Sequence, residues 1–509
     1  MTPEPSDRLR ILMVSAHLAP LEHDAGGRDR HATPGRDTGR AVGSLATALA
    51  SMGHDVRVVI PRYAHIDLGR IEAKGDIQPF AVPMDRRAEA ATVYRTSLPE
   101  GVTVYLVDDP RYFGAGLTYP VMNEGERAVF LSRAALELLK RPEVTWQPDI
   151  IHCHDWQAGL VPNWLRSVYR DDPTFARAAS VFTIHDLEHQ GVLGYRVLEL
   201  AGLSEYGFFT HPGIPALSEL VNLLARGVIH ADAVTTVSET YATEILTPEY
   251  GELLDPLFRD VGERLVGILN GADAPGYEPA SDDLIPAPFS VDTLERRAEN
   301  KAALQSALAL QPNAEALLMG LITHLDATHG WDLLSETLEP MLDNLNVQVA
   351  ILGAGEPSYE DRVASLTRRY PGRIRRIAAS GAELEHLLYA GSDVYLAPAR
   401  VEPNGSHHLL AMLYGAVPVV HATGGLADAV HDYDRAREAG NGFRFESYDA
   451  WALYTAVVRA AQIHRHPTLW RPLQRGCMTH DISWGTAATK YVDVYRWAQR
   501  HRRPRDIGR

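Results

Sequence analysis

The chain has 509 residues, 45% of them hydrophobic, and a formal net charge of −16 at pH 7. This length is too great for one hydrophobic core and indicates two domains. The acidic balance argues against a protein that binds nucleic acid or acidic membrane surfaces in general.

The start of the chain, MTPEPSDRLR, lacks the apolar run of a signal peptide and leads directly into a strand-like segment. No apolar stretch approaches the roughly 20 residues that a membrane helix needs. The two cysteines, Cys153 and Cys477, lie far apart and have no zinc-like spacing. We therefore expect a soluble, reduced, cytoplasmic protein with no nucleic-acid or membrane partner.

Short apolar runs alternate with amphipathic helical stretches along the first half of the chain. This alternation predicts a parallel sheet covered by helices on both faces. The predicted strands are Ile11–Ser15, Val56–Ile60, Val102–Val107, Ile150–His152, Val181–Ile184 and Ala233–Val237.

A second series of the same kind begins near Leu317, after a segment rich in Pro and Asp that is typical of a hinge. We place one domain at residues 9–275, a second at 276–489 and a C-terminal helical segment at 490–509. Two doubly wound halves of this kind hold a ligand in the cleft at the carboxyl ends of their strands. The second series is Leu317–Ile322, Val347–Leu352, Ile374–Ile377, Val394–Leu396 and Val417–Val420.

Two strands of the first domain end in histidine. His152, His154 and Asp155 could be interpreted as metal ligands, but on a strand the two histidines share a face from which Asp155 points away. A buried structural role is favoured for His152, whereas Asp155 and Trp156 are placed to line the cleft. His185 ends the next strand, and this position favours a hydrogen-bonding role in the cleft over a buried structural one.

Two further strand-to-helix junctions lie in the second domain. Glu402 stands beside Pro403 and Gly405, and Thr423-Gly424-Gly425 follows one helix and one strand later. Helix starts offer free N–H groups to a diphosphate, and a carboxylate suits sugar hydroxyls. The pair therefore predicts a nucleotide-sugar site. Asn270 and Gly271, before the hinge, would by themselves form an ordinary turn.

Together these motifs resemble the glycogen synthases of bacteria and the starch synthases of plants, glycosyltransferase family 5. The resemblance runs from about Arg10 to about Trp497, with matching order and spacing. Its most specific stretches are Pro148–Trp156, Val181–Asp186, Ala231–Ser238, Gly267–Asp273, Glu402–Gly405 and Thr423–Asp428.

The resemblance implies the GT-B architecture: two Rossmann-like domains around a deep cleft, with a C-terminal helix that crosses back to the first. It also implies retaining transfer of glucose from ADP-glucose, or sometimes UDP-glucose, to an α-1,4-glucan, with no cofactor and no metal.

The same resemblance assigns roles to residues of this chain. Asp155, His185 and Glu402 would be the catalytic set, the first two flanking the donor glucose and the acceptor, and Glu402 holding sugar hydroxyls. The donor would be bound by Gly26, Gly27, Trp156, Asn270, His324, His329, Gly405, Thr423, Gly424 and Gly425.

The sequence departs from the family mainly where the diphosphate is handled. The family carries a lysine near the position of Asp24, and an arginine and a lysine where this chain has His324 and His329. Near Glu402, this chain has Asn404, Ser406 and His407 in place of Cys, Leu and Thr, and Ala379–Gly381 replaces the family's Ile-Gly-Tyr. Imidazole is a weaker cation at pH 7 than guanidinium or ammonium. Losing one electrostatic contact to a developing charge can cost about 10²–10³ in rate.

Three interpretations remain open. Arginines 28, 30, 36 and 40, on an altered loop, would supply the missing charge of an active transferase, unless they form a solvated surface. In the second interpretation, the chain is an active enzyme that uses a different donor, because the contacts to the base and the phosphates are the ones that changed. Alternatively, the chain is a catalytically impaired relative that serves as a glucan-binding or regulatory protein. A nucleotide-sugar epimerase of similar build is a further, weaker alternative.

Overall fold

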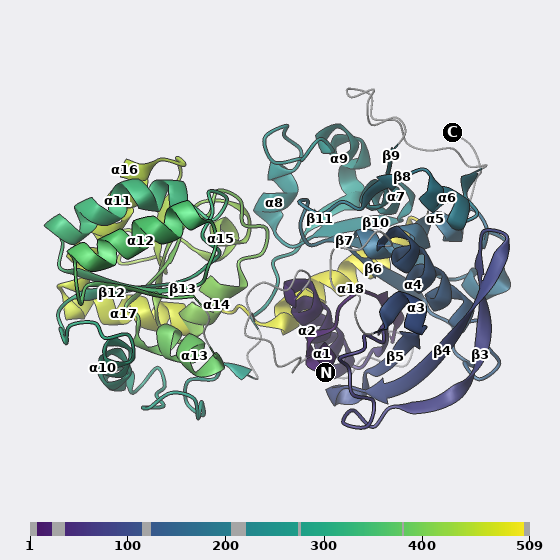
Figure 1. Cartoon of the computed structure of the whole chain (residues 1–509), viewed down its shortest axis with the longest axis horizontal. Helices are drawn as coiled ribbons and strands as arrows, with labels where there is room; N and C mark the ends of the chain where they lie inside the picture. Colours follow the sequence, from purple (N-terminus) through teal and green to yellow (C-terminus); the bar gives the residue numbers. More distant parts are fainter. Residues whose placement is uncertain are drawn as a thin grey trace.

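The computed structural model describes residues 8–22, 36–114, 124–204, 220–272, 276–378 and 381–502. Figure 1 shows two lobes: the N-terminal lobe is coloured purple to teal, and the C-terminal lobe is mostly green. Within these ranges no helix is long and apolar enough to cross a membrane.

The N-terminal domain is built on a large twisted sheet. Within the described ranges it has nine strands in the order β11-β10-β7-β6-β1-β2-β5-β4-β3, parallel except where β4 pairs antiparallel with β5 and with β3. Most residues of its parallel strands are apolar and buried because helices cover both faces. The strands are β1 (Arg10–Val14), β2 (Asp55–Pro61), β3 (Lys74–Met84), β4 (Arg87–Ser97), β5 (Thr103–Asp108), β6 (Ile150–His154), β7 (Ala179–Ile184), β10 (Ala233–Thr236) and β11 (Leu265–Gly267), with a separate pair β8 (Val192–Gly194) and β9 (Leu220–Asn222).

Helices of this domain connect successive strands and pack on the sheet. Asn222 and Ser238 cap the starts of α7 and α8, their side chains accepting from the backbone N–H groups of Ala225 and Tyr241. The helices are α1 (Ala19–Glu22), α2 (Arg36–Ser51), α3 (Pro110–Phe113), α4 (Glu124–Leu138), α5 (Leu160–Arg166), α6 (Arg196–Leu200), α7 (Leu223–His230), α8 (Glu239–Glu244) and α9 (Asp255–Val261).

The C-terminal domain has a parallel sheet whose six strands, counted over the described residues, follow the order β14-β13-β12-β15-β16-β17. This order is that of a Rossmann fold, in which the connections diverge between the first and fourth strands. Here those strands are β12 and β15, so the loops after them open a crevice. The strands are β12 (Leu317–Ile322), β13 (Val347–Leu352), β14 (Ile374–Ile377), β15 (Val394–Ala397), β16 (Val417–His421) and β17 (Phe443–Phe445).

The helices that cover this second sheet alternate with its strands, as the sequence predicted. The two doubly wound domains confirm the predicted fold class. The helices are α10 (Arg297–Ala307), α11 (Trp331–Asn344), α12 (Pro357–Arg369), α13 (Ala382–Gly391), α14 (Ser406–Leu413), α15 (Gly424–Ala429), α16 (Ala450–His464) and α17 (Pro467–Met478).

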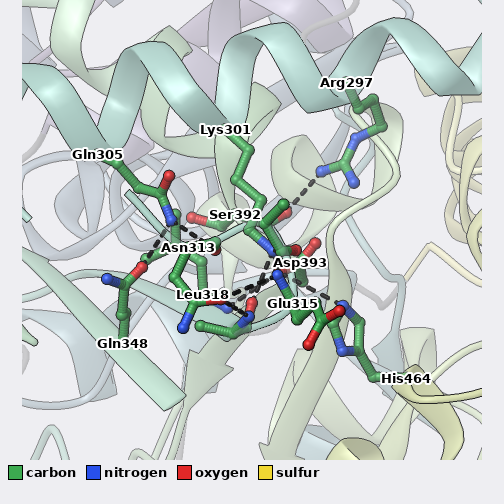
Figure 2. Close-up of polar contacts among 12 residues, drawn as sticks. Arg297, Lys301, Gln305, Asn313, Glu315, Leu318, Gln348, Ser392, Asp393 and His464 are labelled. Atoms are coloured by element: carbon green, nitrogen blue, oxygen red, sulfur yellow. Dashed lines mark hydrogen bonds and ion pairs between the residues drawn. The ribbon is translucent and has the colours of Figure 1, made fainter. Parts of the chain in front are cut away.

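A buried polar network joins α10 to the sheet of the C-terminal domain (Figure 2). Lys301 donates from Nζ to Asp393 Oδ2 at 2.7 Å and to the carbonyl of Ala316 at 2.6 Å. Asp393 Oδ2 also accepts from the backbone N–H of Leu318, at the second residue of β12. His464 Nε2 lies 3.6 Å from the same oxygen. These contacts satisfy a buried charge and fix the position of β12, whose carboxyl end forms part of the site.

The last helix, α18 (Trp484–Arg500), lies in the N-terminal lobe, where Figure 1 shows it in yellow. It begins before residue 490, where the sequence placed the start of this segment. Tyr491 and Tyr495 are buried against the sheet, and the Tyr495 hydroxyl lies 2.8 Å from His152 Nδ1. This helix therefore ties the end of the chain to the first domain.

Candidate active site

A cavity of about 470 Å³ lies between the two domains. Its walls come from the carboxyl ends of β7, β12 and β15 and from the start of α2. The N-terminal domain contributes Asp37, Thr38, Arg40, His185, Asp186, Glu188 and His189; the C-terminal domain contributes, among others, Ile322, Thr323, His324, His329, Glu385, Glu402, Asn404, Gly405, His407, His408 and Leu426. The cavity lies where two doubly wound domains are expected to bind a ligand.

Asp155 does not line this cavity but contacts residues that do. It follows β6 with a left-handed φ of 56°, a strained conformation for a residue with a side chain. Its carboxylate accepts from the Thr38 hydroxyl at 2.9 Å and from the backbone N–H of His185 at 2.8 Å. Both of these partners line the cavity. The structure therefore shows Asp155 as the group that positions His185 and the first turns of α2.

His185 lines the cavity, and the buried imidazoles of His154 and His152 lie behind it. Its Nε2 lies 3.1 Å from His154 Nδ1. Burial lowers the pKa of His154 well below its ordinary value and that of His152 to about 3, and the neighbouring histidines add to the effect. His152 is also bonded at both ring nitrogens, to Tyr495 and Thr183. His152 is thus a neutral structural residue, as the sequence favoured.

Glu402 is placed by the loop that follows β15. Its Oε1 accepts from the backbone N–H of Gly405 at 2.9 Å. Gly405 itself has a φ of 70°, and a Cβ there would approach His408 Nδ1 to 2.6 Å, so glycine is required. Burial raises the pKa of the Glu402 carboxyl, and Asp37 across the cavity adds to this rise. A carboxyl group held in this way can form hydrogen bonds with sugar hydroxyls.

Thr423, Gly424 and Gly425, predicted to bind the diphosphate, are not among the residues that line this cavity. The Thr423 hydroxyl donates to Glu244 Oε1 at 2.9 Å, and the Gly424 N–H lies 3.2 Å from Glu244 Oε2. The Gly425 N–H donates to the carbonyl of Glu402 at 3.1 Å. A carboxylate of the N-terminal domain therefore occupies the helix start that the sequence offered to a phosphate.

His324 and His329 line the cavity on the loop between β12 and α11. Asp326 lies between them: its two oxygens are 2.7 Å from His324 Nδ1 and 2.7 Å from His329 Nδ1. Burial opposes ionisation of Asp326, but hydrogen bonds from His329 and His324 outweigh it and lower its pKa. The two predicted residues are thus brought together by a carboxylate, Asp326, that was not predicted as a site residue. An Asp three residues before a His was the available signal.

Arg40 is the predicted loop arginine that the structure places in the cavity wall. Burial alone would lower its pKa, but Tyr277 and Asp37 are among the neighbours that outweigh it and raise the pKa, so the guanidinium stays charged. Gly26, Gly27, Arg28 and Arg30 lie outside the described residues, as does the side chain of Arg36.

Trp156 and Asn270, both predicted to bind the donor, are buried and are not among the residues that line this cavity. Trp156 lines an adjacent groove with Leu193 and Leu253. Both amide atoms of Asn270 are buried without a hydrogen-bond partner. Asp186, Glu385, His407 and His408 line the cavity but were not predicted as site residues.

The chain matches known proteins along most of its length. Residues 10–260 match the starch synthase catalytic domain, and residues 309–463 match the glycosyl transferases of group 1. Glycogen synthases of Desulforudis audaxviator and Thermotoga maritima are each 38% identical to it over 96% of this chain, and over 96% and 99% of their own lengths.

Two solved structures have a similar fold. The catalytic domain of starch synthase IV from Arabidopsis thaliana, bound to ADP and acarbose, superposes with a TM-score of 0.84 at 28% identity, over 97% of this chain and 100% of that one. Sucrose-phosphate synthase from Thermosynechococcus elongatus superposes with a TM-score of 0.56 at 18% identity, over 96% of this chain and 99% of that one. The second likeness concerns the fold alone.

Proposed function

The chain belongs to the glycogen synthase and starch synthase family, glycosyltransferase family 5, and on that premise we propose that it transfers glucose from ADP-glucose to the end of an α-1,4-glucan. The observation that carries the proposal is the cavity between the domains, where His185 and Arg40 of one domain face Glu402 of the other. We place this activity in the cytoplasm, in keeping with two cysteines that are buried and free.

The reaction exchanges one bond at the anomeric carbon of glucose. The bond from that carbon to the diphosphate breaks, and a bond to an acceptor hydroxyl oxygen forms on the same face. The hydroxyl proton leaves with the nucleoside diphosphate. Glu402 would bind the hydroxyls of the transferred glucose, and His185, held by Asp155, would bind on the opposite side of the cavity. Fixing the sugar in this way lowers the entropic part of the barrier.

Departure of the diphosphate places negative charge in the cavity, and fixed positive groups lower the cost. Arg40 is the charged group that we assign to this role. ADP as the leaving nucleotide is supported by the starch synthase structure, which was solved with ADP bound. The presence of Arg40 in the cavity wall supports an active transferase over a catalytically impaired relative.

The alternative, a glucan-binding protein without turnover, rests on a specific observation as well. Carboxyl groups outnumber Lys and Arg side chains among the described residues that line the cavity. A panel of nucleotide sugars incubated with the purified chain and glycogen separates the two. We expect glycogen-dependent release of ADP from ADP-glucose. Glycogen binding without nucleotide release from any donor would establish the non-catalytic alternative, and release without glycogen dependence would favour an epimerase or hydrolase.

A further inference from the structure

The loop between β12 and α11 brings two imidazoles and one carboxylate together at the edge of the cavity. His324, Asp326 and His329 each offer one ligand atom, and these atoms all lie within 4.8 Å of one another. The side chains of His324 and His329 are 54% and 40% exposed, and both residues line the cavity, so the two rings are accessible to a further ligand. Two imidazole nitrogens and a carboxylate oxygen form a donor set that suits zinc and the neighbouring first-row dications.

The loop that carries these residues is held rigidly. Leu325 is fully buried between the first two of them, and its N–H donates to the carbonyl of Ala354 at 3.0 Å. The carbonyl of Thr328 accepts from the N–H of Arg400 at 2.8 Å. Gly330 ends the loop with a φ of 85°, and a Cβ there would meet the carbonyl of Pro398 at 2.2 Å. A loop fixed at both ends keeps its three donors close together before any ligand arrives.

The described charged side chains that line the cavity are mostly acidic, so a bound cation would offset their negative charge. Among its described lining residues, Arg40 is the only arginine or lysine. The opposing carboxyl groups are those of Asp37, Asp186, Glu188, Glu385 and Glu402. A diphosphate adds further negative charge, and among the residues that the structure describes the single guanidinium of Arg40 does not balance it. A dication at the edge of the cavity would supply charge where the departing group needs it.

We propose that His324, Asp326 and His329 bind one transition-metal dication, Zn²⁺ or a neighbouring first-row ion, with an open coordination position toward the cavity. The metal would take the place of the protons that now lie between the two rings and the carboxylate. An oxygen of the donor diphosphate would occupy the open position; this last step rests on the proposed function. Mg²⁺ is a poor occupant because it prefers oxygen ligands in an octahedral shell.

Titration of the full chain tests the site without reference to catalysis. After treatment with a chelator, Zn²⁺ binding is measured by calorimetry and Co²⁺ binding by its visible absorption. We expect one ion per chain in the wild type, and a loss of more than about 100-fold in affinity in His324→Ala/His329→Ala, beyond what removing a supporting partner costs. Asp326→Asn should also weaken binding. Equal affinities in wild type and the double variant, or no stoichiometric binding, would overturn the site.

His189→Ala is the matched control. His189 is an exposed histidine on the same cavity and, like His329, stands three residues after an aspartate, but in the described part of the chain no second histidine shares that carboxylate. Its removal should leave Zn²⁺ affinity unchanged. Thermal unfolding of each variant without metal separates loss of a ligand from loss of the fold. A control variant that weakens binding as much as the double variant would contradict the assignment to this loop.

Binding of ADP with and without Zn²⁺ tests the role of the metal. We expect ADP affinity to rise about tenfold or more when the site is loaded, consistent with typical coupling energies, and to lose this dependence in the double variant. Zn²⁺ binding without any effect on ADP would overturn the role at the diphosphate. Failure of glucose transfer, with metal-dependent ADP binding intact, would count against the proposed function and not against the metal site.

Discussion

Some residues around the cavity line it, and others hold the lining residues in position. Glu402 and His185 line it from opposite domains, whereas Asp155 acts through the His185 backbone and the Thr38 hydroxyl. Sequence motifs identified all three acidic and imidazole groups but did not separate these roles. Asp155 has its supporting role because it adopts a left-handed φ in the turn after β6. No local sequence pattern predicts that conformation.

Glu402→Gln tests the carboxyl group that binds the sugar. The amide keeps the shape of the side chain but removes its charge and replaces one of the two acceptor oxygens with an NH₂ donor. We expect kcat for glucose transfer to fall by about 100-fold or more, the size of effect seen for one electrostatic contact in an active site. Steady-state kinetics measures it, with Glu383→Gln, an exposed carboxylate at the start of α13, as the control. Equal rates in Glu402→Gln and wild type would refute the role.

Arg40→Met tests the cation assigned to the diphosphate. Methionine fills a similar volume without charge, so the change removes a charge-assisted contact worth about 1.5–3 kcal/mol. We expect ADP affinity to fall by about 10- to 100-fold, measured by calorimetry. Arg86→Met, on an exposed arginine in the turn between β3 and β4, should have no effect. Unchanged ADP binding in Arg40→Met would leave the diphosphate without its assigned arginine.

At the scale of secondary structure, apolar runs located most parallel strands of both sheets correctly. Most of those strands are buried on both faces, so their sequences are largely hydrophobic and easily recognised. The antiparallel hairpin β3–β4 escaped notice because only one of its faces is buried, and its tight turn at Asp85 lacks the usual glycine. Packing of whole elements, not local propensity, decides such strands.

Asp393→Asn tests how the network beneath α10 holds the sheet that carries the site. Breaking a buried ion pair while leaving Lys301 charged costs about 3–5 kcal/mol in the free energy of unfolding. Denaturant titration should show this loss. Glu199→Gln, which breaks the exposed pair with Arg196, should change stability by less than about 1 kcal/mol. A loss below 1 kcal/mol in Asp393→Asn would contradict the importance of the network.

The ionisation of Asp393 should also make the folding stability depend on pH. Burial opposes ionisation of Asp393, but Lys301 and His464 outweigh it and hold its pKa far below the ordinary value. A depressed carboxyl pKa stabilises the fold above the unfolded pKa of about 3.9. That stabilisation is lost as the pH falls below about 4. Wild-type stability should therefore decrease more steeply than that of Asp393→Asn between about pH 5 and about pH 2, and parallel curves would be inconsistent with this.

At the scale of the whole molecule, contacts between the two domains determine which groups of a sequence motif are free to bind a ligand. Thr423-Gly424-Gly425 has the sequence of an anion-binding helix start, yet Glu244, from the other domain, accepts its hydrogen bonds. Nothing near Thr423 in the sequence predicts that partner. The family resemblance gave the two domains and their cleft. It did not reveal which groups meet across the cleft in this chain.

Asp428→Ala tests the interdomain contact. Asp428, on α15, accepts from the hydroxyl of Ser238 at 2.5 Å and from the N–H of Thr240 at 3.2 Å, both at the start of α8. Removing it should loosen the two domains, which small-angle scattering would detect as a larger radius of gyration. Asp432→Ala breaks a pair with Arg459 within one domain and should not change the radius. An unchanged radius in Asp428→Ala would show that other contacts suffice.

The most direct test of the central claim is elongation of a short maltooligosaccharide with ADP-glucose by the purified chain. The proposed function predicts products longer by one glucose at a time, joined by α-1,4 bonds as seen by nuclear magnetic resonance, with one ADP released per glucose added. Glu402→Gln should form them far more slowly. ADP-glucose bound but never consumed, in the presence of acceptor and of Zn²⁺, would contradict the claim that this cavity transfers glucose.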